Sequence, residues 1–250
     1  MATTEIGERL TEAHRLAQAR LGAQVVIELG SAWALMDVTD LDRSALRWAA
    51  VASPIIRNRR VQSANLGAAY LRSFRTAELG LAVNDHAPVL SPTVPNEALL
   101  SSLRVTGPVK VKQALSRGLS PTDAMALGQA QSSGAGMRHA INGGRDTIIG
   151  SLNTDPRALG YMRVTSVKPC GFCVMLSSRG PVYKSEGTAS FDPHDDCQCQ
   201  PVPSYHKDDP WPESAQRNQD IWREAQKSAD HDSPFSSAPL NVLRRHLSQL

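Results

Sequence analysis

All four cysteines of this 250-residue chain lie in one short stretch. The first two form a C-G-F-C motif at Cys170 and Cys173, and about 20 residues later the motif H-D-D-C-Q-C places His194 beside Cys197 and Cys199. A C-x-x-C turn lets two thiolates grip one ion, and a second ligand pair from a later loop completes a tetrahedron. The spacing therefore predicts a closed structural metal site.

Five candidate ligands compete for the four positions of such a site. Cys170 and Cys173 are the firmer half, because a C-x-x-C pair binds from a single tight turn. Two of His194, Cys197 and Cys199 complete the set, and the sequence does not say which two. The expected cofactor is one structural zinc ion, and nothing in the pattern indicates an open catalytic position.

The same cysteines admit three other interpretations. A redox C-x-x-C that opens a helix fits the extended run 162–167 before it, but leaves the second motif unexplained. A zinc deaminase needs a glutamate in an upstream H-x-E, whereas His139 is followed by Ala140 and Ile141. Two disulfides need an oxidising compartment. Because residues 1–9 are acidic and polar rather than a signal peptide, we expect synthesis in the reducing cytosol, which favours a metal.

The composition is that of a folded, soluble protein, with 41% hydrophobic and 20% charged residues. Aromatic residues make up only 5%, so we expect helices packed through Ala, Leu and Val, plus a small module that relies on its metal. A net charge of +3 does not support DNA contact, and the one basic cluster, Arg57, Arg59 and Arg60, is typical of a solvated helix face. No apolar run approaches the ~20 residues that span a bilayer, so no membrane contact is expected.

The N-terminal part has the periodicity of helices. Apolar residues recur at helical spacing from Ile6 to Val25, and the segment 37–42 ends this first helix, with Asp40 or Asp42 as the cap of the next. A second helix is predicted up to Pro54 and a third from there to Gly80. The four aromatic side chains that we expect in the helical core are Trp33, Trp48, Tyr70 and Phe74.

Beyond the prolines at 88–108, helical character resumes at 109–116 and again from Pro121, with Ser120 as cap. The segment 124–140 is rich in Ala and Gly, which predicts a closely packed or partner-facing helix, or simply a buried one, that ends at Gly143 and Gly144. Strands of a small sheet around the metal are predicted at 147–149, 161–167 and 181–183.

These patterns define an α+β protein with four parts. The predicted parts are a helical N-terminal region (1–84), a Pro-rich linker or crossover (85–108), a module with the Cys/His site (109–205) and a helical tail or arm (206–250). We expect the first region and the metal-stapled module to unfold separately. The tail contains a polar helix near 213–229 and a basic amphipathic piece at 240–250, which either wraps over its own domain or reaches a neighbour.

Common catalytic motifs are absent from the sequence. There is no G-x-S-x-G, H-E-x-x-H or P-loop, and His139 follows Gly134 and Gly136 where the last glycine of G-x-G-x-x-G should stand. His139 with Ser132 or Ser133 is the one Ser-His pair close enough in sequence to propose. A lone histidine is usually a core or surface residue, so no catalytic residue is predicted.

Several short motifs follow one another in a recognisable order. They are R-V-T-S at 163–166, P-C-G-F-C at 169–173, L-S-S-R-G at 176–180, V-Y at 182–183 and H-x-x-C-x-C closed by Pro201. After a helical N-terminal part, this order resembles the MuF-like head morphogenesis proteins of tailed bacteriophages, especially the group from phages of actinobacteria. The resemblance is specific over 145–203 and looser over 10–80. Asp195 stands where that family has proline, which weakens the rigidity of the loop but leaves the ligands.

The resemblance implies a minor capsid protein that associates with the portal and enters the procapsid with the scaffold in small numbers. The implied partners are the portal and the major capsid or scaffold proteins, and the implied location is the phage head, assembled in the host cytoplasm. Similar chains are often labelled capsid maturation protease, so a protease acting on head proteins is the alternative. A zinc-dependent redox or signalling module outside any virion is a third interpretation, which rests on C-x-x-C alone.

Overall fold

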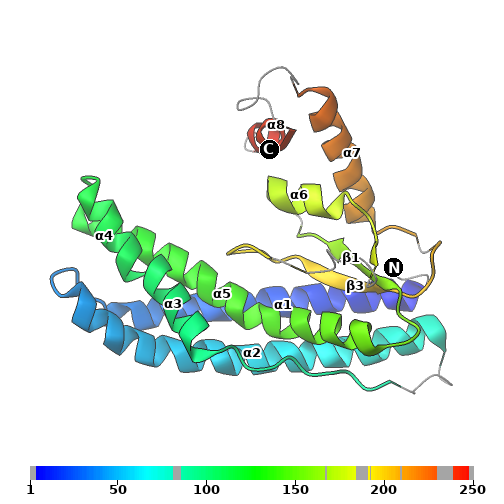
Figure 1. Ribbon diagram of the computed structural model, residues 1–250, viewed down its shortest axis with the longest axis horizontal. Helices are drawn as coiled ribbons and strands as arrows, with labels where there is room; N and C mark the ends of the chain where they lie inside the picture. Colours follow the sequence, from blue (N-terminus) through cyan, green and yellow to red (C-terminus); the bar gives the residue numbers. More distant parts are fainter. Residues whose placement is uncertain are drawn as a thin grey trace.

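A computed structural model describes residues 4–80, 86–166, 168–183, 191, 193–208, 210–229 and 239–247. The elements are α1 (Glu5–Ala32), the 3-10 helix η1 (Trp33–Leu35), α2 (Leu41–Leu79), α3 (Asn96–Thr106), α4 (Pro108–Ser116), α5 (Pro121–Thr154), β1 (Gly160–Val164), α6 (Gly171–Ser177), β2 (Val182–Tyr183), β3 (Gln200–Ser204), α7 (Glu213–Lys227) and α8 (Pro239–Leu247). Three long helices lie side by side, and a small module stands on one end of them (Figure 1). The predicted α+β class is confirmed.

The long helices α1, α2 and α5 form a bundle whose buried side chains make two apolar clusters. All four aromatic residues expected in the helical core are buried, and Trp33 meets Trp48 edge to face with ring centroids 5.1 Å apart. The cluster that contains Trp33 and Trp48 also includes Val111, Ala124 and Ile141, which lie beyond the predicted linker or crossover. The helices α4 and α5, which the sequence placed in the Cys/His module, therefore pack in the bundle instead.

The prediction of two helices meeting at Pro54 is wrong. The structure has one continuous helix there, α2, with Pro54 in its interior and Asp40 at the N-cap position. A proline removes one hydrogen bond of the helical ladder, which is a local cost. The flanking side chains of Ala52 and Ile56 are fully buried against the neighbouring helices. Burial along the rest of the helix outweighs that local cost.

The predicted strand at 147–149 is also wrong, because α5 runs without interruption to Thr154. Gly143 and Gly144 do not end this helix but mark its closest approach to α2. A Cβ atom on Gly143 would lie 2.1 Å from the carbonyl oxygen of Arg60, and one on Gly144 would lie 2.8 Å from that of Ser63. The small residues of α5 thus serve close packing against helices of the same chain.

The segment predicted as a linker or crossover, 85–108, contains the helix α3, and Pro108 is the first residue of α4. The extended stretch before α3 is held along α2 and α5. The guanidinium of Arg60 donates to the Pro92 carbonyl, the Ser91 hydroxyl and the carboxylate of Asp146. Residues 86–95 therefore cross over the surface of the bundle rather than separating two bodies.

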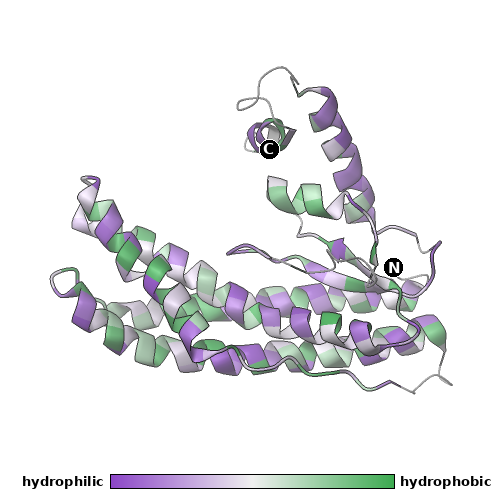
Figure 2. Cartoon of the chain, in the orientation of Figure 1, coloured by the Kyte–Doolittle hydropathy of each residue, from purple (hydrophilic) through white to green (hydrophobic). Residues whose placement is uncertain are grey.

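The small module begins with a three-stranded antiparallel sheet in the order β2-β1-β3. The predicted strands at 161–167 and 181–183 correspond to β1 and β2, although residue 167 lies outside the described residues. The short helix α6 is largely hydrophobic, whereas α7 is hydrophilic along its length (Figure 2).

The described part of the tail folds back onto its own module. Val174 of α6, Ala225 of α7 and Leu243 of α8 form one buried cluster. Of the two interpretations of the tail, the structure shows the first, in which it wraps over its own domain. Among the helices that the structure describes, none is both long enough and apolar enough to cross a bilayer.

We predict that Gly144→Ala destabilises the fold by ~2–3 kcal/mol, because the added methyl group must displace the backbone of Ser63. Gly150→Ala is the matched control, since it lies in the same helix with nothing within 4 Å of an added Cβ. The control should be neutral or stabilising by up to ~1 kcal/mol. Urea unfolding followed by circular dichroism measures both, and equal effects would contradict the close helix contact.

A second prediction concerns His14, whose ring is buried and stacks on Tyr70 with centroids 4.4 Å apart. Burial lowers the pKa of His14 to about 4, below the ~6.5 of an exposed histidine. As pH falls from 6.5 towards 4 the unfolded chain binds a proton that the folded chain does not, so the protein loses stability. Between pH 7 and 4.5 the loss should be ~2–3 kcal/mol smaller in His14→Phe. Urea unfolding at the two pH values measures this loss, and equal losses in both proteins would contradict the prediction.

Candidate metal centre

The C-x-x-C motif forms the start of a short helix. Cys170 is the N-cap residue of α6, and its sulfur accepts a hydrogen bond from the backbone N–H of Cys173 at 3.5 Å. The second half of the site is a tight turn, in which the N–H of Cys197 donates to the carbonyl of His194 at 3.2 Å. Asp196 in this turn has a φ of +60°, a conformation that Asp tolerates better than most residues.

All five predicted ligands are brought together. The Nε2 atom of His194 lies 2.9 Å from the sulfur of Cys170 and 3.3 Å from that of Cys173. The sulfurs of Cys173 and Cys197 are 3.7 Å apart, about the edge of a tetrahedron with metal–sulfur bonds of ~2.3 Å. Cys199 joins Cys173 and Cys197 in a second group of donors, and Cys173 belongs to both groups. This arrangement can hold a metal ion.

The four cysteines differ in burial but are all free thiols. Cys170 is exposed, whereas the side chains of Cys173, Cys197 and Cys199 are buried. Hydrogen bonding with Cys173 lowers the pKa of Cys170 to about 5 and also lowers the pKa of Cys197 well below its usual range. The thiolate is the form that binds a metal, so the cluster favours the reactive form at two of its sulfurs.

The imidazole of His194 is oriented for coordination. Its Nδ1–H donates to the carbonyl oxygen of Asp195, because that oxygen can only accept. The other nitrogen, Nε2, is then left as the acceptor that faces the thiols. In metal sites, a hydrogen bond from the ring nitrogen that does not bind the metal fixes the tautomer and the ring direction of a histidine ligand. The donor set and its orientation therefore fit a bound ion.

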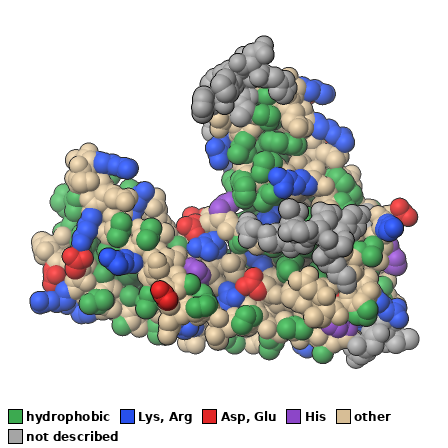
Figure 3. Space-filling model, viewed as in Figure 1, with side chains coloured by type: hydrophobic (Ala, Val, Ile, Leu, Met, Phe, Trp, Pro, Cys, Tyr) green, Lys and Arg blue, Asp and Glu red, His purple; other side chains and the backbone are tan. Residues whose placement is uncertain are grey.

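One face of α5 holds the turn that carries His194, Cys197 and Cys199. The carboxylate of Asp196 packs on Gly134, where an added Cβ would lie 2.5 Å from its oxygen. Arg138 pairs with Asp195 at 2.6 Å. Arg145 donates to the backbone carbonyls of Cys197 and Cys199. In Figure 3, basic, acidic and histidine side chains gather in the hollow between the bundle and the module.

The role of this helix face was not predicted, because the helix was expected to end at Gly143 and Gly144, before Arg145. The spacing of Gly134, Arg138 and Arg145 places all three on one side of a helix, which is the signal that was present. That signal needs a helix running past Gly144, and the paired glycines favoured a helix end instead.

The other residues singled out from the sequence lie apart from the cluster or serve the fold. His139 and Ser132 are buried in α5, and the hydroxyl of Ser132 donates to the carbonyl of Gln129 in the same helix. Burial lowers the pKa of His139 to about 4. Arg57 and Arg59 bind groups of the same chain, as Arg60 does, rather than forming a free basic face.

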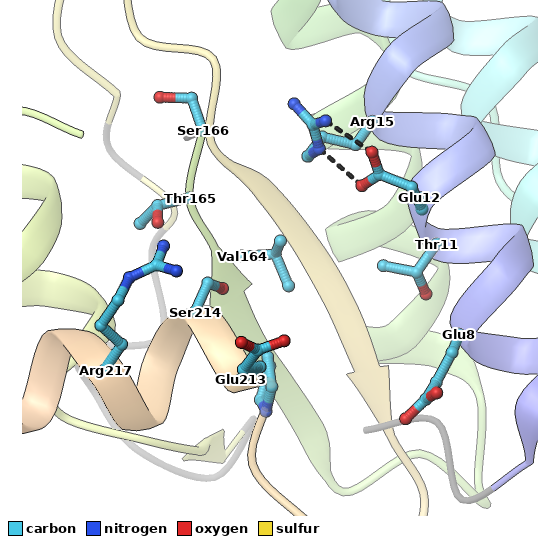
Figure 4. Close-up of a pocket in the computed structure, with 11 residues that line it drawn as sticks. Glu8, Thr11, Glu12, Arg15, Val164, Thr165, Ser166, Glu213, Ser214 and Arg217 are labelled. Carbon is cyan, nitrogen blue, oxygen red and sulfur yellow. Dashed lines mark hydrogen bonds and ion pairs between the residues drawn. The ribbon is translucent and has the colours of Figure 1, made fainter. Parts of the chain in front are cut away.

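A polar cleft of about 420 Å³ lies between α1, the end of β1 and the start of α7 (Figure 4). Its wall carries Glu8, Glu12, Arg15, Glu213 and Arg217. Glu12 and Arg15 satisfy each other through two hydrogen bonds of 2.6 and 2.7 Å. The cleft therefore lies between the bundle and the module and is lined by charges of both signs. The described side chains around it show no nucleophile paired with a base.

The fold and the cluster define a class: a long helical bundle joined to a small sheet module with a Cys/His metal-binding geometry. The family described as VG15 protein matches residues 5–225, and the chain belongs to this phage protein family. The Gene 15 protein of Mycobacterium phage D29 is 33% identical over 144 residues, which cover 56% of this chain and 48% of that protein. The match thus spans about half the length of this relative. No solved structure matches the chain significantly.

We predict that the cluster binds Co²⁺ and that Cys173→Ser weakens binding most, because Cys173 belongs to both groups of donors. Cys199→Ser should retain binding, since one histidine and three thiols remain. Titration with Co²⁺, followed by the sulfur-to-metal charge-transfer absorbance, measures both variants. Binding by Cys173→Ser that equals the unsubstituted protein would contradict this placement of the donors.

Proposed function

We propose that this chain is a minor capsid protein of a tailed bacteriophage that takes part in head morphogenesis. It contacts the portal and the major capsid or scaffold proteins during assembly and ends up in the phage head. The observation that carries this proposal is a closed Cys/His cluster on a helical bundle in a member of a phage protein family. Such a cluster fixes a fold and leaves no open position for a substrate. The order of short motifs that resembles the MuF-like proteins supports the same conclusion.

Zinc is the ion that this donor set favours. Thiolates and imidazole are soft or borderline ligands, and tetrahedral sites made of them select zinc in reducing compartments. The expected role is structural, because the sheet of the module is short and three of its cysteines are part of a buried cluster. A small module with a limited apolar core commonly depends on a metal for stability.

The alternative is a capsid maturation protease acting on head proteins. A Ser-His protease needs a nucleophile hydrogen-bonded to a base and an oxyanion hole on the same scaffold. In the part of the chain that the structure describes, the Nε2 atom of His139 has no hydrogen-bond partner, and Ser132 donates within its own helix. These observations favour the assembly role over the protease.

We predict that a phage encoding His139→Ala still processes its capsid protein and forms infectious particles, as do Ser132→Ala and Ser133→Ala phages. Loss of a general base would lower a proteolytic rate by orders of magnitude, whereas the substitution should cost an assembly protein only ~1–2 kcal/mol. Cys173→Ser should stop head assembly, because the module loses its metal. Plaque counts, capsid protein size on gels and mass spectrometry of purified particles provide the measurements.

Two controls accompany this experiment. Elemental analysis of the purified protein should find about one zinc per chain. Mature particles should contain the chain beside portal and capsid proteins. Its absence from particles overturns the virion role. Uncleaved capsid protein in the His139→Ala phage, with normal amounts of this chain, makes the protein an enzyme.

A further inference from the structure

Arg145 is a buried cation without a carboxylate partner. Its side chain is fully buried in the interior between α5 and the cysteine turn. Its guanidinium donates to the carbonyl of Cys199 at 2.9 Å, to the carbonyl of Cys197, and to the side-chain oxygen of Asn142 at 2.9 Å. All three acceptors are neutral. Among the described residues no aspartate or glutamate forms an ion pair with it.

This situation is unfavourable, because a buried charge needs an opposite charge or a dense set of hydrogen bonds. Elsewhere in the chain the rule is obeyed: buried Arg75 forms an ion pair with Asp155 at 2.8 Å. A second buried cation near Arg145 adds to this cost. Arg163 is also buried, and its guanidinium lies 3.7 Å above the ring of Phe191 with Nη1 unpartnered.

The nearby acidic residues do not form an ion pair with Arg145. Asp195 is engaged by Arg138 on the outer side of the turn, and the carboxylate of Asp196 lies against Gly134. Arg145 instead contacts the backbone of Cys197 and Cys199, two residues whose sulfurs belong to one group of metal donors. The anion that faces Arg145 must therefore come from the cysteines.

We propose that Arg145 is the counter-cation of a metal centre that binds through at least three thiolates. This inference rests on the proposed metal site and deepens it. A divalent ion with three thiolates and one neutral imidazole has a net charge of −1, and with four thiolates −2, whereas two thiolates and neutral ligands leave no charge for Arg145. The three sulfurs that lie within 4.8 Å of one another are those of Cys173, Cys197 and Cys199, and Cys170 and His194 are the remaining candidate ligands.

The charge of Arg145 should affect the stability of the metal-loaded and the metal-free protein in opposite directions. In the loaded protein the anionic centre stabilises Arg145, and Arg145 in turn stabilises bound metal. In the metal-free protein, each sulfur that regains a proton no longer offsets the same guanidinium, so its buried charge is compensated less. Replacing it by an uncharged side chain of similar length should therefore harm the loaded form and spare or help the metal-free form.

The experiment compares the full chain with its Arg145→Met variant, loaded with zinc or stripped by a chelator. We expect zinc affinity, measured by competition with a chromogenic chelator, to fall tenfold or more in the variant. Its melting temperature should fall in the loaded form and stay the same or rise in the stripped form. Arg138→Met on the same helix is the control, because it pairs with Asp195, and it should lower both melting temperatures alike.

Arg145→Lys is the second variant, and it keeps the charge while losing most of the forked hydrogen bonds. It should retain affinity closer to that of the unsubstituted protein than Arg145→Met does, and it serves alone if Arg145→Met does not fold. Equal affinity losses in both variants, or equal melting shifts with and without zinc, mean that Arg145 only clamps the carbonyls and overturn the proposal. A Co²⁺ spectrum indicating fewer than three thiolates also overturns it. An unsubstituted protein that binds no metal overturns the zinc site itself.

Discussion

The docking of the cysteine turn on one face of α5 is the interaction on which the arrangement of the molecule depends. Asp196 on Gly134, Asp195 with Arg138, and the carbonyls of Cys197 and Cys199 on Arg145 fix the second half of the cluster to a rigid helix. The first half is carried by α6 in the module. The five donors therefore come together only when the bundle and the module are docked on each other. The cluster thus connects the two parts.

The composition of α5 follows from this double task. One side must approach α1 and α2 closely, which explains glycines such as Gly136 against Leu29 and Gly144 against Ser63. The other side must present charged groups at fixed positions. A helix of 34 residues can serve both sides only if it does not break between them. Packing on two helices keeps it intact where its own sequence is a poor helix former.

The sequence predicted the grouping of the five candidate ligands better than the fold around them. The spacing of Cys170, Cys173 and Cys197 is a local pattern, which a few residues encode. The two halves of the site also lie close together in space because α6 packs on β1 while the turn docks on α5. That arrangement is not visible in a single sequence. Paired Gly143 and Gly144 gave the wrong helix end, because glycine has the same local signature at a helix end and at a close helix contact. The continuous α2 through Pro54 was missed for a related reason: tertiary burial overrides local preference.

The candidate metal site is part of the second buried apolar cluster of the molecule. Cys173, Cys197 and Cys199 belong to a buried cluster that also contains Tyr70 and Phe74 of α2. A thiol without its metal packs as a small hydrophobic side chain, so part of this cluster persists without an ion. The buried charge of Arg145 does not share this tolerance, because apolar contacts do not replace the opposite charge that a buried guanidinium needs. Loss of a bound ion should therefore first weaken the contact between α5 and the cysteine turn. The apolar contacts of Tyr70 and Phe74 should break later.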